Sequence, residues 1–296
     1  MSVARRQRTL CRRASVEGFG YFSGQDVRVE FRPAEAGAGI TFVRRDLDDA
    51  RIGVSPTLRI DVPRRTTLEQ DGVRVEMVEH ILASLAGLQI DNCDVAVNAA
   101  EMPGCDGSAL PFVAALDAAG VVEQDEPVRR ICVHRAIRVG DQNNWIEAQP
   151  ARGAGLSISF ELDYGVHTAV GRQSFALRVN PDSFRTELAP CRTFILEEVA
   201  QAMAARGIGT RVTPKNLLIF TSAGPIENSL RFDNECVRHK VLDIVGDLAL
   251  TGCDVTADVV AYRSGHKLHA ELAGRLLEQA EASLDQWSTA TARMAS

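Results

Sequence analysis

Hydrophobic residues recur at helical spacing over residues 234–252. The pattern predicts one helix whose apolar stripe consists of Val237, Val241, Ile244, Val245 and Leu248. Asp233 or Asn234 can cap the start of this helix, and Gly252 suits its end. Residues 75–87 and 111–120 show similar spacing and are also expected to be helical, with Gly87 as the stop signal of the first.

Other stretches alternate between hydrophobic and polar residues, as half-buried strands do. Strands are expected over residues 8–16, 27–33, 36–45 and 93–101. Residues 45–66 contain Pro56 and Pro63, so we expect a loop there. The polar and acidic residues 123–127 are typical of a linker.

The pattern that precedes this linker returns after it. RPAEAGAGITF (32–42) resembles QPARGAGLSISF (149–160), and VEHILASLAG (78–87) resembles VRHKVLDIVG (237–246). The alternative is chance similarity between short apolar motifs, but several motifs recur in the same order. We therefore expect an α+β fold with two domains of like topology, residues 1–125 and 126–296, each a sheet layer packed with helices.

The segment that separates the two repeated motifs is longer in the second domain than in the first. Phe42 and Val78 are 36 positions apart, whereas Phe160 and Val237 are 77 apart. The additional residues read as a strand, a helix and a strand over about residues 193–222, a segment without an expected counterpart in the first domain. Long additions of this kind often carry function, although a neutral surface elaboration is the alternative.

Composition narrows the class of protein. The formal net charge of −6 argues against a general nucleic-acid binder. Seven cysteines without a CxxC pair favour reduced thiols, so we expect a cytoplasmic protein. No apolar run approaches 18 residues, so stable membrane insertion is not expected.

Candidate chemistry lies on the two matching helices. His239 and Asp243 are four residues apart and therefore point from one face of their helix, which is half of a zinc site. His80 occupies the matching position in the first domain and converges with them if the domains face one another. The alternative is a salt-bridged surface helix. An open fourth coordination position would be typical of a catalytic zinc site.

Three further residues suit amide hydrolysis. Glu79, next to His80, is a candidate general base, and His266 in the SGH loop is a candidate general acid. Asp247, one helical turn beyond Asp243, can orient His266 and favour its charged form, or it can simply satisfy a backbone group. His269 follows on the next helix and is expected to have no role.

Several motifs together resemble one family. Five motifs are similar, in the same order, to those of UDP-3-O-acyl-N-acetylglucosamine deacetylases, which are zinc amidases of lipid A synthesis. The motifs are VEHILASLAGL, EMPGCDGSALPFV, CRTF, LRFDNECVRHKVLDIVGDLALTG and YRSGHKL. The resemblance runs from about Arg8 to Leu277. It implies two domains with the active site between them and an acylated UDP-sugar substrate. It also implies zinc ligands His80, His239 and Asp243. Apart from the resemblance, we expect a monomer.

The same resemblance assigns roles to further positions. It implies that Glu79 is the base, that His266 is the acid with Asp247 behind it, and that Thr193 of CRTF helps to hold the oxyanion. The strand–helix–strand insert would form an apolar passage for the acyl chain. Substrate contacts are expected from Lys240, Phe194, Asp163, Tyr164 and Arg263.

The sequence departs from the family pattern at several places, of which one is GIGTRVTPKN (207–216) in the insert instead of a Gly-Gly turn and three bear on the choice of substrate. Phe22 stands where a histidine is common, Asn144 where a basic residue is frequent, and residues 163–171 differ from the usual pattern around Asp163 and Tyr164. These departures leave two alternatives open. One is a related deacetylase for another N-acetyl sugar, and the other is a non-catalytic sugar-nucleotide binding protein, which would need neither Glu79 nor His266.

Overall fold

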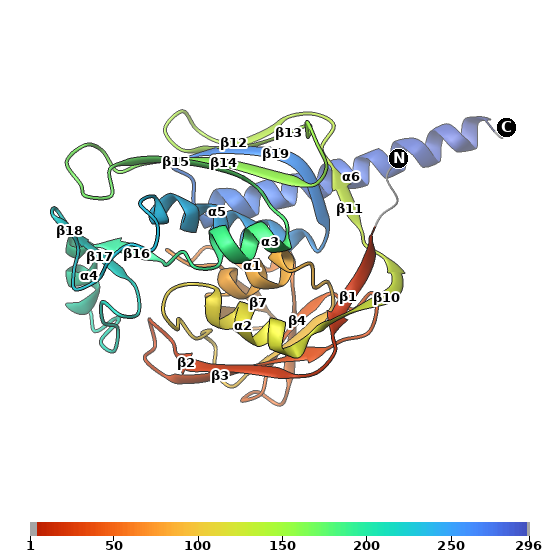
Figure 1. Ribbon diagram of the computed structural model, residues 1–296. Helices are drawn as coiled ribbons and strands as arrows, with labels where there is room; N and C mark the ends of the chain where they lie inside the picture. Colours follow the sequence, from red (N-terminus) through yellow and green to blue (C-terminus); the bar gives the residue numbers. More distant parts are fainter. Residues whose placement is uncertain (1–4, 295–296) are drawn as a thin grey trace.

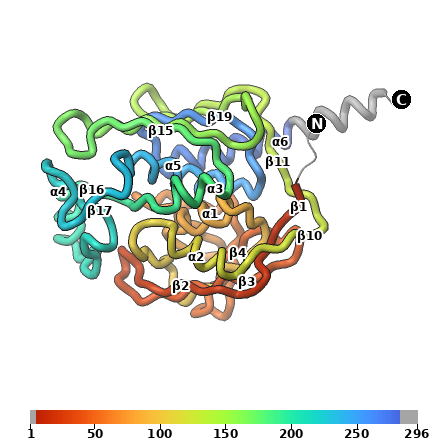
Figure 2. Tube along the Cα trace, in the orientation of Figure 1, coloured from red at the N-terminus to blue at the C-terminus, as the bar shows by residue number. Residues whose placement is uncertain are grey.

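Two sheets form the outer layers of the molecule, with helices between them (Figure 1). The computed structural model describes residues 5–294. Helices α5 (Glu235–Leu248) and α6 (His266–Met294) pack on one sheet, and α2 (Leu110–Ala119) packs on the other. Helix α1 (Glu79–Gly87) lies in the middle, where it packs against α5 (Figure 2).

The two sheets have the same topology. The order of the first is β2 (Ala14–Phe19), β3 (Asp26–Pro33), β9 (Cys93–Val97), β4 (Ile40–Arg44) and β5 (Ala50–Gly53). The order of the second is β12 (Ile137–Gly140), β13 (Trp145–Gln149), β19 (Asp254–Tyr262), β14 (Leu156–Asp163) and β15 (Arg172–Arg178). Strand β11 (Arg130–Cys132) also pairs with β19.

The direction of pairing is repeated as well. In both sheets the third and fourth strands run parallel, and the other neighbours along the order run antiparallel. The matching words place Phe42 opposite Val95 in one sheet and Phe160 opposite Ala261 in the other, all buried in one continuous core. The expected α+β fold with two halves of like topology is confirmed. The domain boundary at residue 125 stays a prediction.

Residues 123–127 are not a linker. They belong to strand β10 (Val121–Pro127), which pairs antiparallel with β1 (Arg6–Leu10), with Leu10 opposite Val121. The carboxylates of Glu123 and Asp125 are exposed, so the strand lacks the apolar alternation that would identify it. The single strand expected over residues 8–16 is two strands, β1 and β2, with a break between Leu10 and Ala14.

The loop expected over residues 45–66 contains regular structure. It holds β5, a short 3₁₀ helix at Pro56–Leu58 and β6 (Arg59–Ile60). Strand β6 joins β7 (Thr67–Gln70) and β8 (Val73–Glu76) in a small sheet. The first half therefore has an addition of its own before α1, but this addition is an antiparallel three-stranded sheet and not a strand, a helix and a strand.

The insert of the second half has the expected strand–helix–strand order. It consists of β16 (Phe194–Leu196), α4 (Glu197–Ala204) and β17 (Leu218–Thr221), to which β18 (Gly224–Pro225) adds. A short helix α3 (Pro181–Ser183) and a π-helical turn (Phe184–Leu188) precede it. The insert contacts the other half, since the amide of Asn216 donates to the carbonyl oxygen of Cys105 at 3.1 Å.

Helix α5 is buried, so its polar face is not a solvent-exposed face and the alternative of a surface helix is wrong. It ends in a 3₁₀ turn (Ala249–Thr251) and the left-handed Gly252. Asn234 precedes α5 without a side-chain cap. None of the helices described between residues 5 and 294 combines the length and the hydropathy that a membrane span requires.

Gly87 does not lie beyond α1 as a stop signal but is its last residue, and α1 begins only at Glu79 because residues 75 and 76 belong to β8. What Gly87 provides is space, since a Cβ atom there would lie 2.3 Å from the ring of Phe184. The matching Gly246 of α5 also provides space, because its Cβ atom would lie 2.1 Å from the carbonyl oxygen of Glu79. Gly246 therefore sets how closely α1 and α5 can approach, and Gly87 leaves room for the ring of Phe184.

We predict that Gly246→Ala lowers the free energy of unfolding by about 1–3 kcal/mol, because the added methyl group pushes α1 away from α5. Chemical denaturation measures the change. Gly274→Ala in α6 is the matched control, because a Cβ atom there meets nothing within 4 Å. We expect that control to be neutral or stabilising by about 0.5–1 kcal/mol. Equal stability of the Gly246→Ala protein and wild type would contradict the close approach.

Candidate metal centre and active site

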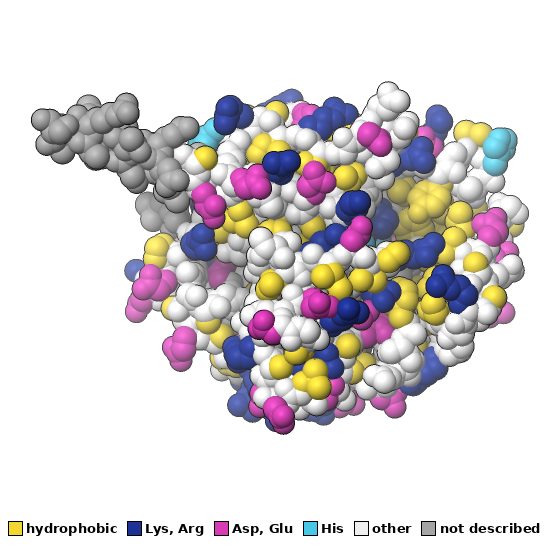
Figure 3. Space-filling view, turned by 180° about the vertical axis from the view of Figure 1, so that it is seen from behind, with side chains coloured by type: hydrophobic (Ala, Val, Ile, Leu, Met, Phe, Trp, Pro, Cys, Tyr) yellow, Lys and Arg dark blue, Asp and Glu magenta, His cyan; other side chains and the backbone are white. Residues whose placement is uncertain are grey.

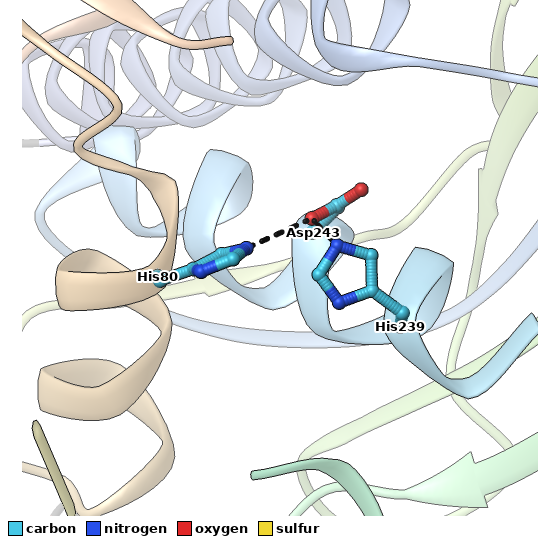
Figure 4. A group of neighbouring side chains, drawn as sticks. All are labelled: His80, His239 and Asp243. Carbon is cyan, nitrogen blue, oxygen red and sulfur yellow. Dashed lines mark ion pairs between the residues drawn. The ribbon is translucent and has the colours of Figure 1, made fainter. Parts of the chain in front are cut away.

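Three possible metal ligands meet where α1 and α5 touch. His80 comes from α1, and His239 and Asp243 come from successive turns of α5 (Figure 4). Asp243 Oδ1 lies 3.4 Å from His239 Nε2 and 3.8 Å from His80 Nε2. One ligand atom from each residue lies within 4.8 Å of the others, and all three side chains are buried.

The state of these groups fits a divalent metal ion. Asp243 Oδ1 is buried without a hydrogen-bond partner in the described part of the chain, while Oδ2 accepts from Lys240 Nζ at 2.8 Å. His239 Nδ1 lies 3.1 Å from the carbonyl oxygen of Cys191, so that nitrogen donates and Nε2 keeps its lone pair. Burial, reinforced by His239, lowers the pKa of His80 to about 3. Neutral imidazoles and a carboxylate form a ligand set typical of such ions.

Glu79 lies beside this cluster at the start of α1. Its Oε2 accepts from the backbone N–H of Thr66 at 3.0 Å, and its Oε1 lies 4.0 Å from His266 Nε2. Burial raises the pKa of Glu79 to about 7, and the neighbouring His266 opposes part of that rise. A carboxyl group with this proton affinity can both accept and release a proton near neutral pH.

His266 is the first residue of α6, not a loop residue, and faces Glu79 across the cluster. Its Nδ1 lies 2.8 Å from Asp247 Oδ2, and Asp247 Oδ1 accepts from the hydroxyl of Thr66 at 2.5 Å. Burial alone would lower the pKa of His266, but the charge and hydrogen bond of Asp247 outweigh it and raise that pKa to about 9. His266 is therefore protonated at neutral pH, with Nε2–H free to donate.

These groups open into a cavity of about 940 Å³, which is large enough for a sizeable ligand. One part of its lining consists of Glu79, His80, His239, Asp243 and His266. Hydrophobic side chains of the insert form another wall, among them Ile195, Val199, Met203, Ile208 and Ile219. On the face drawn in Figure 3, hydrophobic side chains line a hollow beside the insert.

Thr193, Phe194 and Lys240 line the same cavity. The segment that carries Thr193 is anchored to α5, because Arg192 forms a buried ion pair with Glu235 at 2.8 Å. The ring of Phe194 lies 6.5 Å from that of His239, centroid to centroid. The start of the insert is thereby held against the metal-ligand cluster.

A second cavity, of about 670 Å³, holds the remaining substrate-contact candidates. Asp163, Tyr164, Arg263 and Lys240 line it, and Tyr164 and Lys240 also line the larger cavity. Asp163 already accepts hydrogen bonds from Gly165, Arg172 and Tyr262. That carboxylate is therefore largely occupied within the protein, which makes Asp163 the least available of the four.

Two residues at which the sequence departs from the family pattern also face the larger cavity. Phe22 and Asn144 both line it, and the guanidinium of Arg65 lies 3.9 Å from the centre of the Phe22 ring. Where the family pattern has an imidazole, this chain therefore presents an aromatic ring stacked with a cation.

Two residues that lie at the site, His269 and Thr66, were not predicted from the sequence to belong to it. His269, which was expected to have no role, is fully buried and its Nδ1 lies 2.8 Å from Asp247 Oδ2. Its spacing of three from His266 on one helix was an available signal. Thr66 bonds both Glu79 and Asp247, yet no local pattern marks it, because both partners are distant in sequence.

Three buried side chains that could hold a metal ion lie beside Glu79 and His266 and face a cavity lined by both halves, an arrangement typical of metal-dependent hydrolases. Residues 7–278 match the family model of UDP-3-O-acyl N-acetylglycosamine deacetylases, and the chain belongs to that family. It is 37% identical over 275 residues to the UDP-3-O-acyl-N-acetylglucosamine deacetylase of Myxococcus xanthus, covering 92% of this chain and 86% of that one. It is 36% identical over 294 residues to the deacetylase of the same name from Actinobacillus succinogenes, covering 97% and 93%.

We predict that one divalent metal ion binds per chain through His80, His239 and Asp243. Each replacement, His80→Ala or His239→Ala, removes one of three protein ligands and should lower metal content well below one ion per chain. His167→Ala is the matched control, since His167 is exposed. Elemental analysis after dialysis measures the stoichiometry. Full, tightly held metal in both ligand variants would rule out this site.

Proposed function

We propose that this protein hydrolyses the N-acetyl amide of UDP-3-O-acyl-N-acetylglucosamine, giving UDP-3-O-acyl-glucosamine and acetate, the committed step of lipid A biosynthesis. The observation that carries the proposal is the meeting of Glu79, His266 and the three-ligand cluster in one cavity. Family membership supports the substrate. We further propose that the protein acts in the cytoplasm as a monomer.

The metal we propose is Zn²⁺, because two imidazoles and one carboxylate with an open position are the ligands of many catalytic zinc sites. When bound, zinc supplies Lewis acidity that polarises the amide carbonyl and makes water more acidic. The cation would also lower the pKa of Glu79 from its raised value, which favours the carboxylate form that a base requires.

Glu79 accepts the proton of the attacking water. The N–H of Thr66 holds Oε2 of Glu79 at 3.0 Å, which leaves Oε1 facing His266 and the cavity. Water adds to the carbonyl carbon, and the C–N bond then breaks. A carboxylate whose second oxygen is fixed by a backbone donor is well oriented for proton transfer.

His266 delivers a proton to the departing nitrogen. With Nδ1 bonded to Asp247, its Nε2 carries the proton that faces the cavity. An amine leaves far more readily than an amide anion, so this proton is needed for the C–N bond to break. We assign Thr193 and Lys240 to the carbonyl oxygen, where negative charge develops, because both line the cavity at the cluster.

The shape of the cavities supports an acylated sugar nucleotide. The apolar wall of the insert suits an acyl chain, since each buried methylene contributes about 0.8 kcal/mol. We place the nucleotide in the second cavity, where Tyr164 offers a partly exposed ring and Lys240 and Arg263 offer positive charge. Phe22 and Asn144 favour a second candidate, a deacetylase for another N-acetyl sugar, because both departures line the larger cavity.

Purified, zinc-loaded protein tests the two candidates directly. It should release acetate from the acylated UDP-sugar with a kcat/KM far above that for UDP-N-acetylglucosamine and other N-acetyl sugars. A preference for an unacylated sugar would support the second candidate. Binding of the acylated substrate without acetate release would support a non-catalytic binding protein.

We predict that Glu79→Gln keeps the metal and the fold but lowers kcat by about 10²–10⁴-fold, because the amide cannot accept the proton. Steady-state kinetics at equal metal content measures the loss. Glu76→Gln is the control: it removes a carboxylate three residues before Glu79 that pairs with Arg65, and it should keep most of the activity. A Glu79→Gln enzyme with nearly normal kcat and full zinc would remove Glu79 from the mechanism.

We predict that Met203→Asp flattens the dependence of kcat/KM on acyl-chain length, because a carboxylate in the apolar wall opposes burial of methylenes. Ala202→Asp is the matched control, since Ala202 is the neighbouring residue on α4 but is exposed and outside the cavity lining. Substrates of increasing acyl length measure the slope. Equal slopes in the two variants would place the acyl chain elsewhere.

A further inference from the structure

Asp247 is held from three sides inside the protein. Its Oδ2 lies 2.8 Å from Nδ1 of both His266 and His269, and its Oδ1 accepts from the Thr66 hydroxyl at 2.5 Å. Asp247 and His269 are fully buried. The carboxylate that orients the acid is therefore shared with a second imidazole, which the reaction outlined above does not use.

The second imidazole has one consistent proton arrangement. Its Nδ1 must carry a proton to donate to a carboxylate, and its Nε2 then accepts from the hydroxyl of Ser264, 2.8 Å away. Burial lowers the pKa of His269 more than Asp247 raises it, so the ring is neutral at neutral pH. His269 is thus a fixed neutral donor whose orientation is set at both nitrogens.

We propose that His269 is a positioning residue for the general acid: it fixes the Asp247 carboxylate and takes up part of its negative charge, and thereby sets the acid strength of His266. The inference rests on the proposed function for its kinetic consequence. Its structural basis is the shared oxygen of Asp247, which both imidazoles reach at the same distance.

Sharing the oxygen has a defined electrostatic effect. A neutral donor to the carboxylate stabilises its charged form and reduces its basicity. Without that donor, Asp247 attracts the proton of His266 more strongly, and the proton is transferred to the substrate less readily. The other charged or titratable groups around His266 are unchanged by a substitution at position 269; they are Glu79 and His80 on α1 and His239, Lys240 and Asp243 on α5.

Two substitutions of nearly equal shape isolate the donor. His269→Leu removes it, and His269→Asn keeps an N–H group that can reach Asp247. In wild type, activity should fall as the pH rises through about 9, where His266 loses its proton. In His269→Leu this alkaline limb should move up by about half a unit to one unit, and kcat should fall about tenfold. His269→Asn should restore both toward wild type.

A second measurement is independent of turnover. NMR titration of the imidazole nitrogens reports the pKa of His266 directly in each protein. If the wild-type protein releases no acetate, the proposed function fails. Even then, a pKa of His266 that rises in His269→Leu but not in His269→Asn would support the positioning role of His269. An unmoved pKa of His266 in folded His269→Leu would overturn the inference, as would equal effects of Leu and Asn.

Ser264→Ala serves if the leucine variant does not fold. Loss of the hydroxyl that donates to His269 Nε2 weakens donation from Nδ1. The pKa of His266 should then rise in the same direction as in His269→Leu, by a smaller amount. A wild-type pKa of His266 in folded Ser264→Ala would then overturn the inference.

Discussion

The backbones of α1 and α5 approach so closely at Gly246 that a methyl group there would overlap the carbonyl oxygen of Glu79. This contact fixes the candidate metal centre, because His80 lies on one helix and both His239 and Asp243 lie on the other. A shift of one helix by a fraction of an ångström would alter two of the three ligand separations. The same contact also places Glu79, which begins α1, within 4.0 Å of His266. Packing between two backbones thus controls the positions of both the proposed ligands and the proposed base.

Charge is buried at the site in pairs that offset one another. Asp243 is matched by Lys240, and Asp247 by the donors around it. Outside the site, Arg5 pairs with Asp91 of the first half and Asp254 of the second, each at 2.7 Å, and so joins the two halves at their far end. Pairing of this kind adds little net stability, since desolvation of each charge opposes the attraction. Its effect is to fix geometry, which a cavity between two halves requires.

The sequence was sufficient to predict an element wherever its hydrophobic residues recur with a clear helical or strand period. The helical spacing of His239 and Asp243, and the repeated words around Phe42 and Phe160, anticipated the α+β fold with two like halves. Strand β10 was missed because its side chains are mostly exposed and only pairing with β1 makes it a strand. Thr66 was missed because its partners are 13 and 181 positions away. Gly87 was misread because its neighbour, Phe184, lies in the other half of the chain. Features made by tertiary contact leave no local signal.

The internal repeat matches α1 with α5 position by position, and the two copies differ where the chemistry is. His80 and His239 correspond, but Ser84 stands where α5 has Asp243, and Arg238 stands where α1 has Glu79. A symmetric pair of first halves would offer two histidines and two glutamates but no counterpart of Asp243 as the proposed third ligand. A symmetric pair of second halves would offer ligands without a base. The site therefore depends on divergence between two joined copies, and no homodimer of either copy could reproduce its asymmetry.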